Sequence, residues 1–341
     1  MTHPVYHGKR AVCLVLCLVL IATLLCSCSS SSKPIEPSEQ DIMVVATCEG
    51  FDVYYEEMRY VTLAFRDELA ARYGKDIWTD PEKTAKYLPM LKEKVETSLK
   101  INYAILSLCR DFNIDPEEKA IQEGVQEMID ETVADLGGRK NYIAALEEMY
   151  MTDHFVRFTL ATDLCETEMI YVMMDMDLVI KSEKEFLPYA LDDENFCATY
   201  HVYIGNDPGD NIEENRRRAE VVYEKLQEGT PIKELIGSTY NEDLLSSGMP
   251  YHFTYGEYDT EYEKAAFALE IGEVSGVVEC EDGFYVIQRQ PLNEQYIVAN
   301  ISELLKRYQY AEAQLLIEEQ RAQLKLEWTE YGASLDLLAM K

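Results

Sequence analysis

The sequence predicts an α+β protein: a mostly helical body into which a small α+β domain with an antiparallel sheet is inserted. Three observations lead to this fold class. Residues 54–181 carry apolar side chains at helical spacing, residues 198–288 contain short runs of β-branched and aromatic residues, and helical spacing returns over 301–328. We therefore expect a helical domain made of residues 42–195 plus 296–341, with residues 196–292 as the insert.

The first 41 residues lie outside the predicted fold. Lys9 and Arg10 precede an apolar run over 11–25 that is short for a membrane span, which is typical of a signal peptide over residues 1–27. The order Leu-Cys-Ser-Cys that ends this run resembles the lipobox of bacterial lipoproteins, with Cys28 as the lipidated residue. Cys26 fits less well because Leu25 would precede the cleavage, and plain secretory cleavage or an uncleaved anchor are the alternatives. Residues 28–41 are rich in Ser, Pro and Glu, which predicts a flexible tether.

The helical body begins with one expected strand over 42–48, which ends at the turn signal Glu49-Gly50. Helices are expected after it at residues 54–73, 81–112, 116–136, 141–150 and 152–181. The last helix, over 301–328, has an apolar stripe that needs a partner, because a helix cannot bury such a stripe alone. We expect it to pack on the helices that precede residue 190.

The insert has the expected order βαααββ. The strands are expected at 198–204, 274–280 and 284–288, and the helices at 213–227, 231–238 and 261–269. Residues 281–283 read Glu-Asp-Gly, a hairpin turn, and residues 241–255 read as a polar and aromatic loop.

The composition excludes several classes of function. The chain has 341 residues and a net charge of −32, so phosphate neutralisation by a basic face is not expected, and we predict no nucleic-acid partner. Of the nine cysteines, five follow Cys28, and their spacing matches neither a disulfide framework nor a metal site. We expect them to be buried free thiols and predict no bound metal.

Residues 198–289 resemble the parvulin-type peptidyl-prolyl isomerase family. The best stretch runs from Gly256 to Arg289, and the preceding strand reads Thr-Tyr-His-Val-Tyr-Ile with His201 at the place of the family's first histidine. The positions that fit without a gap are Glu263, Ala265, Ala266, Phe267, Leu269, Gly272, Glu273, Ser275, Gly283 and Ile287.

The layout of the whole chain resembles foldase lipoproteins of the PrsA and SurA type, in which a parvulin domain is inserted in a helical, SurA-N-like chaperone domain. This resemblance implies a foldase outside the cytoplasm, anchored to the bacterial membrane by its lipid, which isomerises X–Pro bonds in unfolded or partly folded secreted polypeptides. It implies no cofactor. The oligomeric state does not follow from it.

The resemblance also implies the site residues. His201, Glu242 and Tyr285 occupy the polar positions of the family's catalytic site, with Asp243 as the alternative to Glu242. The residues that would hold the proline ring are Phe253, Tyr258 and Tyr262.

Two departures bear on activity. Tyr285 stands where the family has its second histidine, and the glycine-rich loop before Phe253 is shorter and keeps one glycine, Gly248. His252 is a further candidate for the space of the missing histidine. These changes predict weak isomerase activity. The alternative is a non-catalytic holdase chaperone with a degenerate parvulin domain. A transporter's binding lipoprotein is not expected, because the chain lacks two lobes of alternating βα units.

Overall fold

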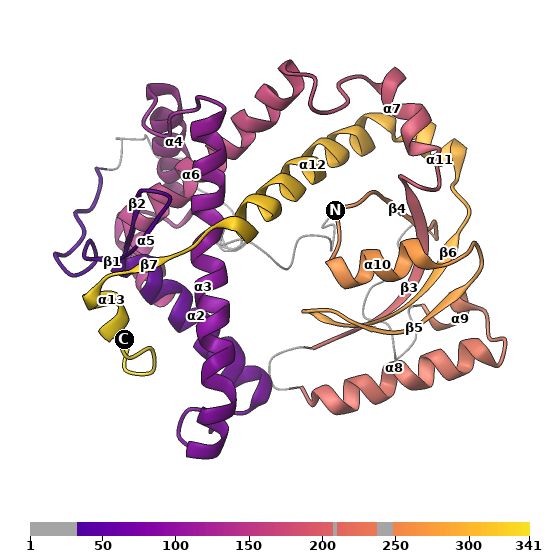
Figure 1. The fold of residues 1–341 in the computed structure, drawn as a ribbon, viewed down its shortest axis with the longest axis horizontal. Helices are drawn as coiled ribbons and strands as arrows, with labels where there is room; N and C mark the ends of the chain where they lie inside the picture. The colour runs from indigo at the N-terminus through magenta and orange to yellow at the C-terminus, as the bar shows by residue number, and fades with distance from the viewer. Residues whose placement is uncertain (1–32, 207–209, 237–247) are drawn as a thin grey trace. The chain divides into compact units, whose positions relative to one another are not determined.

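The computed structural model describes residues 33–206, 210–236 and 248–341. They divide into two compact units, a helical one and one built on a sheet (Figure 1). The helical unit comprises the described residues up to Val172 together with Leu316–Lys341. The sheet unit comprises Met173–Leu315, so the long helix α12 (Ile301–Gln323) passes from one unit into the other.

The helical unit opens with a β-hairpin. Strand β1 (Val44–Cys48) pairs antiparallel with β2 (Phe51–Tyr54), and the turn between them places both Glu49 and Gly50 at positive φ, as a tight two-residue hairpin turn requires. The helices that follow are α2 (Tyr55–Tyr73), α3 (Pro81–Asp111), α4 (Lys119–Asp135), α5 (Arg139–Glu148) and α6 (Asp153–Asp175).

Helix α3 shows why these segments are helical. The Asp80 side chain accepts hydrogen bonds from the backbone N–H groups of Glu82 and Lys83, and Pro81 follows this cap at the first helical position. Leu91, Val95 and Leu99, spaced by four, are buried.

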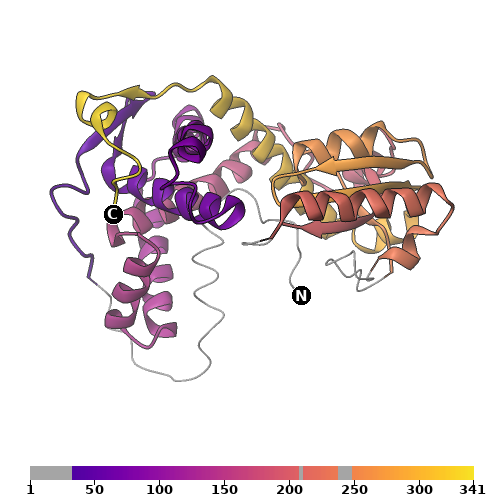
Figure 2. The ribbon, with the colours of Figure 1, turned by 90° about the horizontal axis from the view of Figure 1, so that it is seen from below.

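The end of the chain completes the hairpin sheet. Strand β7 (Glu327–Trp328) pairs with β1, giving the order β2-β1-β7, and helix α13 (Glu330–Ser334) follows it. Gly332 lies against β1 so closely that a Cβ there would be 1.9 Å from the Val45 carbonyl oxygen. Figure 2 shows this C-terminal segment in yellow beside the indigo hairpin.

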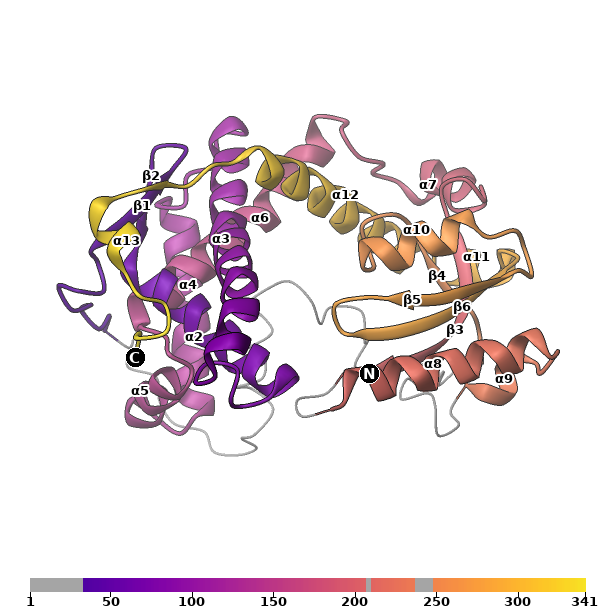
Figure 3. The same ribbon diagram turned by 60° about the horizontal axis from the view of Figure 1, so that its bottom comes forward.

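The sheet unit is built on a four-stranded antiparallel sheet with the order β4-β3-β6-β5. Its strands are β3 (Cys197–Gly205), β4 (Tyr251–Phe253), β5 (Val274–Glu279) and β6 (Gly283–Gln290). Helix α10 (Thr260–Ala268) covers one face, and α8 (Ile212–Gln227) and α9 (Ile232–Leu235) cover the other (Figure 3).

Three further helical segments complete this unit: α7 (Glu183–Ala190), α11 (Glu294–Ala299) and the first part of α12. The Phe186 ring of α7 lies 5.3 Å from the Tyr308 ring of α12 and 6.1 Å from the Phe196 ring that precedes β3. The compact unit therefore extends beyond the residues 196–292 of the predicted insert, whose boundaries stay a prediction.

The α+β class is confirmed, and several details of the predicted elements are wrong. Residues 251–253, expected in a loop, form the edge strand β4, so the sheet has four strands instead of three. The last long helix ends at Gln323, not 328, because Glu327 and Trp328 pair with β1. The helix expected over 152–181 ends at Asp175.

The described part of the predicted tether is bonded to the helical unit. The Ile35 N–H donates to the Asp153 Oδ2 atom at 3.0 Å, and the Asp41 carbonyl accepts from the Glu56 N–H. Residues 33–41 are thus attached to the helical unit by hydrogen bonds. Cys28 and the signal peptide lie outside the described residues.

Candidate active site

The candidate site lies on the face of the sheet that α10 covers. Side chains alternate between the two faces of a strand. On β3, Val202 and Ile204 pack in the apolar core under α8, whereas His201 points to the opposite face. His201 lies opposite Ile287 of β6, in the middle of the sheet.

Seven rings gather on this face, and we call them the aromatic cluster. Its members are His201, Tyr203, Tyr251, Phe253, Tyr258, Tyr262 and Tyr285. The His201 ring stacks on Tyr251 with centroids 4.7 Å apart, and it meets the rings of Tyr262 and Tyr285 edge-on at 5.5 Å and 5.2 Å. Offset and edge-on arrangements of this kind are the favourable ones for aromatic rings.

A buried hydroxyl joins two residues of β3 to α10. The Tyr262 hydroxyl lies 2.8 Å from the Thr199 Oγ1 atom and 2.8 Å from the His201 Nδ1 atom. Burial raises the pKa of Tyr262 well above its usual range, so this group stays a neutral hydroxyl. It fixes the imidazole of His201 against the sheet.

The Tyr285 hydroxyl makes a different bond. It donates to the Asp282 Oδ2 atom at 2.8 Å, within the turn between β5 and β6. Burial raises the pKa of Asp282, and the hydrogen bond from Tyr285 works in the opposite direction. The side chain of Tyr285, which the resemblance places at the position of the family's second histidine, thus has a carboxylate as its partner.

Burial separates the aromatic cluster into a core and a rim. Phe253 and Tyr262 are 0% and 1% exposed, and His201 is 3% exposed. The half-buried rings are Tyr203, Tyr251, Tyr258 and Tyr285. In the described structure, the surface that this cluster offers to a ligand comes chiefly from these tyrosines. Phe253 and Tyr262, which are predicted to hold the proline ring of a substrate, lie beneath them.

Two carboxylates hold the segment that carries Tyr258. Glu263 of α10 accepts from the backbone N–H groups of Gly256 and Tyr258 at 3.0 Å and 2.8 Å. Glu257 accepts from the Thr254 N–H at 2.8 Å and from the Nε atom of Arg307 at 2.7 Å. Burial raises the pKa of Glu263 to about 7. The segment around Tyr258 is thus held to α10 by backbone N–H groups and to α12 by the side chain of Glu257.

The predicted residues are brought together in part. His201, Tyr258, Tyr262, Phe253 and Tyr285 are all in the aromatic cluster, as the ring contacts above show. Glu242, together with its alternative Asp243, lies outside the described residues. Their roles stay predictions.

The interpretation of His252 is wrong. Its Nδ1 atom lies 2.9 Å from the Pro250 carbonyl, its Nε2 atom accepts from the Asn293 N–H at 3.2 Å, and its ring stacks on Tyr296 of α11. Neighbouring side chains of a strand point to opposite faces, so His252 points away from the face that carries Phe253 and His201. Its contacts with Pro250, Asn293 and Tyr296 hold it there. Burial lowers the pKa of His252 to about 4, so it is a neutral structural residue.

Sequence reasoning missed Tyr203, Tyr251 and Asp282. The signal for Tyr203 was present, because it is two residues after His201 on the expected strand 198–204, which places both on the same face. Tyr251 has the same relation to Phe253 only in β4, a strand that the sequence does not predict. For Asp282 the sequence Glu-Asp-Gly predicts a hairpin turn and no role in the site.

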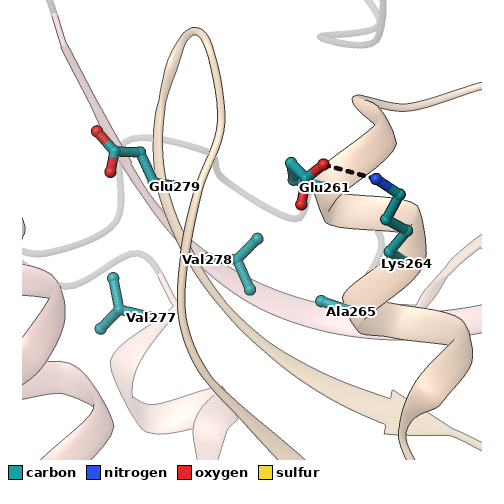
Figure 4. A pocket seen from close by; sticks show the side chains of 6 residues that line it. All are labelled: Glu261, Lys264, Ala265, Val277, Val278 and Glu279. Carbon is teal, nitrogen blue, oxygen red and sulfur yellow. Dashed lines mark hydrogen bonds and ion pairs between the residues drawn. The ribbon is translucent and has the colours of Figure 1, made fainter.

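A shallow hollow of about 520 Å³ lies beside the site, between the outer side of α10 and strand β5 (Figure 4). Val278 lies on the side of the strand that faces α10, and Val277 lies on the other. Its charged groups are paired, Lys264 with Glu261 at 2.8 Å and Glu279 with Arg216. Among the predicted site residues that the structure describes, none lines it.

Within the described ranges, no group of three or more His, Cys, Asp or Glu side chains is placed to hold a metal ion. In the same part of the chain, no helix combines the length and the apolar character that a membrane crossing needs.

The comparisons with known proteins identify the sheet that carries this cluster. Residues 201–290, from His201 to the end of β6, match the family model of the rotamase, the PPIC-type PPIASE domain. This segment is a PPIC-type rotamase domain. The match places a peptidyl-prolyl isomerase domain around the aromatic cluster.

Similarity to known proteins extends beyond the rotamase domain. The foldase protein PrsA of Caldanaerobacter subterraneus subsp. tengcongensis is 21% identical over 287 residues, which are 83% of this chain and 83% of the relative. Among solved structures, PrsA from Streptococcus pneumoniae is 16% identical, with a TM-score of 0.33, over 82% of this chain and 92% of that one. PrsA from Bacillus subtilis is 18% identical, with a TM-score of 0.28, over 71% and 88% of the two chains.

Proposed function

We propose that this protein is a membrane-tethered foldase outside the cytoplasm, which isomerises X–Pro bonds in secreted polypeptides and binds them as a chaperone. The observation that carries the proposal is the coincidence of the rotamase match with the aromatic cluster around His201. The relative named foldase protein PrsA supports the wider role, because its similarity covers 83% of this chain.

The chemistry needs no covalent step. Rotation about an X–Pro bond faces a barrier of about 18–20 kcal/mol, because the amide loses its resonance in the twisted state. A site that binds the twisted amide more tightly than the planar one lowers this barrier. The tyrosines of the rim offer apolar faces for the proline ring, and their hydroxyls and the His201 imidazole offer polar groups for the amide.

A proline-limited refolding assay tests the isomerase function. Tyr258→Ala removes a half-buried ring that stacks on Tyr262 at 4.8 Å, so the acceleration by the protein should fall by about ten-fold or more. Tyr171→Ala, on the helical unit and 57% exposed, is the matched control and should keep the wild-type rate. If the wild type leaves the uncatalysed rate unchanged, the isomerase function is wrong.

A holdase without isomerase activity is the second candidate. It is favoured by Tyr285 at the place of the second histidine and by the complete burial of Phe253 and Tyr262. An aggregation-suppression assay on the same variants separates the two. A holdase would suppress aggregation with equal strength in the wild type and in Tyr258→Ala, and neither would accelerate refolding.

Lipid anchoring at Cys28 rests on the sequence order Leu-Cys-Ser-Cys after an apolar run. Cys28→Ala should release the protein from the membrane fraction, because the acyl chains supply its affinity for the bilayer. Intact-mass analysis of the wild type should show the added diacylglycerol. A membrane-bound wild type without this mass, or a variant that stays on the membrane, would contradict the anchor.

A further inference from the structure

We propose that Asp282 is a positioning residue of the isomerase site, acting through Tyr285, so that isomerase activity requires Asp282 in its carboxylate form. The inference rests on the proposed isomerase function and concerns the same site. It follows from Tyr285, which stands at the place of the family's second histidine, and from its hydrogen bond with Asp282.

The first step is the geometry of the pair. The Tyr285 O–H donates to Asp282 Oδ2 at 2.8 Å, so the hydroxyl proton is directed to the carboxylate and the oxygen keeps its capacity to accept a hydrogen bond. A hydrogen bond with an ionised acceptor is stronger than one between neutral groups. The pair therefore fixes which way the hydroxyl points.

The second step is that both partners sit on rigid supports. The Asp282 carbonyl accepts from the Tyr203 hydroxyl at 3.1 Å and from the Asn206 N–H at 2.9 Å, which ties the turn to β3. The Tyr285 ring lies 4.8 Å from the Tyr203 ring and 5.2 Å from the His201 ring. A site group held this way enters the reaction without reorganisation.

The third step identifies which partner titrates. Burial and the Asp282 carboxylate raise the pKa of Tyr285 far above its usual range, so Tyr285 keeps its proton at any working pH. Asp282 is the group that changes charge, and burial raises its pKa above the usual 3.8. The titratable groups that face it are His201 from β3, which lowers this pKa, and Asp259 from the start of α10, which raises it; Cys280 and Tyr203 also lie beside it.

The consequence is a fall of kcat/KM at low pH, which we call the acid limb of the activity profile. Below the pKa of Asp282 the carboxyl is protonated, so it can donate as well as accept. The Tyr285 hydroxyl then loses its ionised acceptor, and the hydrogen bond that fixed its direction becomes weaker. We expect kcat/KM on Ala-Pro peptides to fall as the pH drops through this range, with the fold retained as judged by near-UV circular dichroism.

The test compares pH profiles between pH 4 and 8 for the full chain without its signal peptide. Asp282→Asn and Tyr285→Phe should each lower kcat/KM by about ten-fold, the scale of one hydrogen bond to a charged group, and each should remove the acid limb. The double variant should have about the same kcat/KM as the less active of the two single variants, because the two residues act as one unit. Asp259→Asn is the charge-matched control: it should keep the limb and move it to lower pH.

A nuclear magnetic resonance titration of the Asp282 carboxyl gives a readout that does not depend on activity. The pKa of Asp282 should rise in Tyr285→Phe, because the hydrogen bond that favours the ionised form is lost. An unchanged pKa means that the pair does not exist in solution, and an acid limb that persists in Asp282→Asn means that another group controls activity. Either result overturns the proposal. If the pair is present and the wild type has no isomerase activity, the proposed isomerase function fails, and the positioning role fails with it.

Discussion

Hydroxyl groups on aromatic rings distinguish this site at the scale of single residues. The resemblance to the parvulin family implies Phe at the position of Tyr262, and here the added hydroxyl bonds to both Thr199 and His201. The sequence shows the extra oxygen but not its partners, because these come from a strand some sixty residues away in the chain. The same holds for Tyr285, whose partner Asp282 is a turn residue.

Tyr262→Phe tests the structural value of that hydroxyl. The substitution keeps the ring and takes one hydrogen-bond partner from each of two buried groups, so we expect the sheet unit to lose about 1–3 kcal/mol of stability. Amide hydrogen exchange on peptides of β3 and β6 measures this loss. Tyr258→Phe, at a half-buried position, should change exchange little, and equal protection in both variants would show that the Tyr262 bonds contribute nothing.

Glu57 makes the stability of the helical unit depend on pH. It is 3% exposed and accepts from the Tyr103 hydroxyl at 2.7 Å and from the Tyr54 N–H at 2.9 Å, and burial raises its pKa from the usual 4.5 to about 7. Between these values the folded state binds more protons than the unfolded chain, so stability falls as the pH rises. His154, whose pKa is raised by Glu56, acts in the same direction, because the stability it adds is also lost as the pH rises.

Urea unfolding at pH 5, 6, 7 and 8 checks this dependence. Both tryptophans, Trp78 and Trp328, lie in the helical unit, so their fluorescence reports on that unit. The free energy of unfolding should fall by up to about 3 kcal/mol across this range, and Glu57→Gln should flatten the slope. Glu93→Gln, at an exposed position of α3, should leave the slope unchanged. A wild-type stability that rises with pH would contradict the assignment.

At the scale of elements, long periodic segments were predictable and short ones were not. The sequence patterns predicted α2, α3 and α8 with boundaries within about two residues, because each has a sustained apolar stripe. Strands β4 and β7 have three and two residues, too few for an alternation to show. They exist because β3 and β1 offer them edges to pair with, and such tertiary partners are not visible in a local pattern.

The contact between the segment after β4 and α12 depends on Gly256. Its φ is +87°, and a Cβ there would lie 2.8 Å from the Ala311 carbonyl oxygen of α12. Gly256→Ala should therefore cost about 1–3 kcal/mol for the backbone conformation alone, with the displaced helix in addition. Hydrogen exchange of residues 251–268 should accelerate. Gly276→Ala, where no heavy atom lies within 4 Å of the new Cβ, is the control that should stay within about 0.5 kcal/mol of the wild type.

At the scale of the whole molecule, the last stretch of chain returns to the part where it began. Residues 316–341 belong to the helical unit, β7 pairs with β1, and the Arg66 guanidinium donates to the Met340 carbonyl at 2.9 Å. The apolar stripe over 301–328 predicted a return to the helical body, and the second part of α12 is in that unit. The first part of α12 lies in the sheet unit. The apolar stripe did not predict this division of the helix, because an apolar face does not specify which partner will cover it.

Because the first part of α12 belongs to the sheet unit, we expect the rotamase domain to need residues beyond 196–292 for its full stability. A fragment of residues 196–292 omits α7 and α12, and with them the bond of 2.9 Å between the Tyr189 and Thr254 hydroxyls and the pairing of Arg307 with the buried Glu257. Arg289 also loses Asp193, whose carbonyl accepts from it at 2.6 Å. We expect the fragment to fold, because both faces of its sheet keep their helices, but with a Tm about 10 °C or more below that of residues 182–315. Arg307→Met in the longer fragment isolates the contribution of the ion pair. Equal melting temperatures for the two fragments would show that the rotamase domain is stable without its flanking helices, as its sequence boundaries predict.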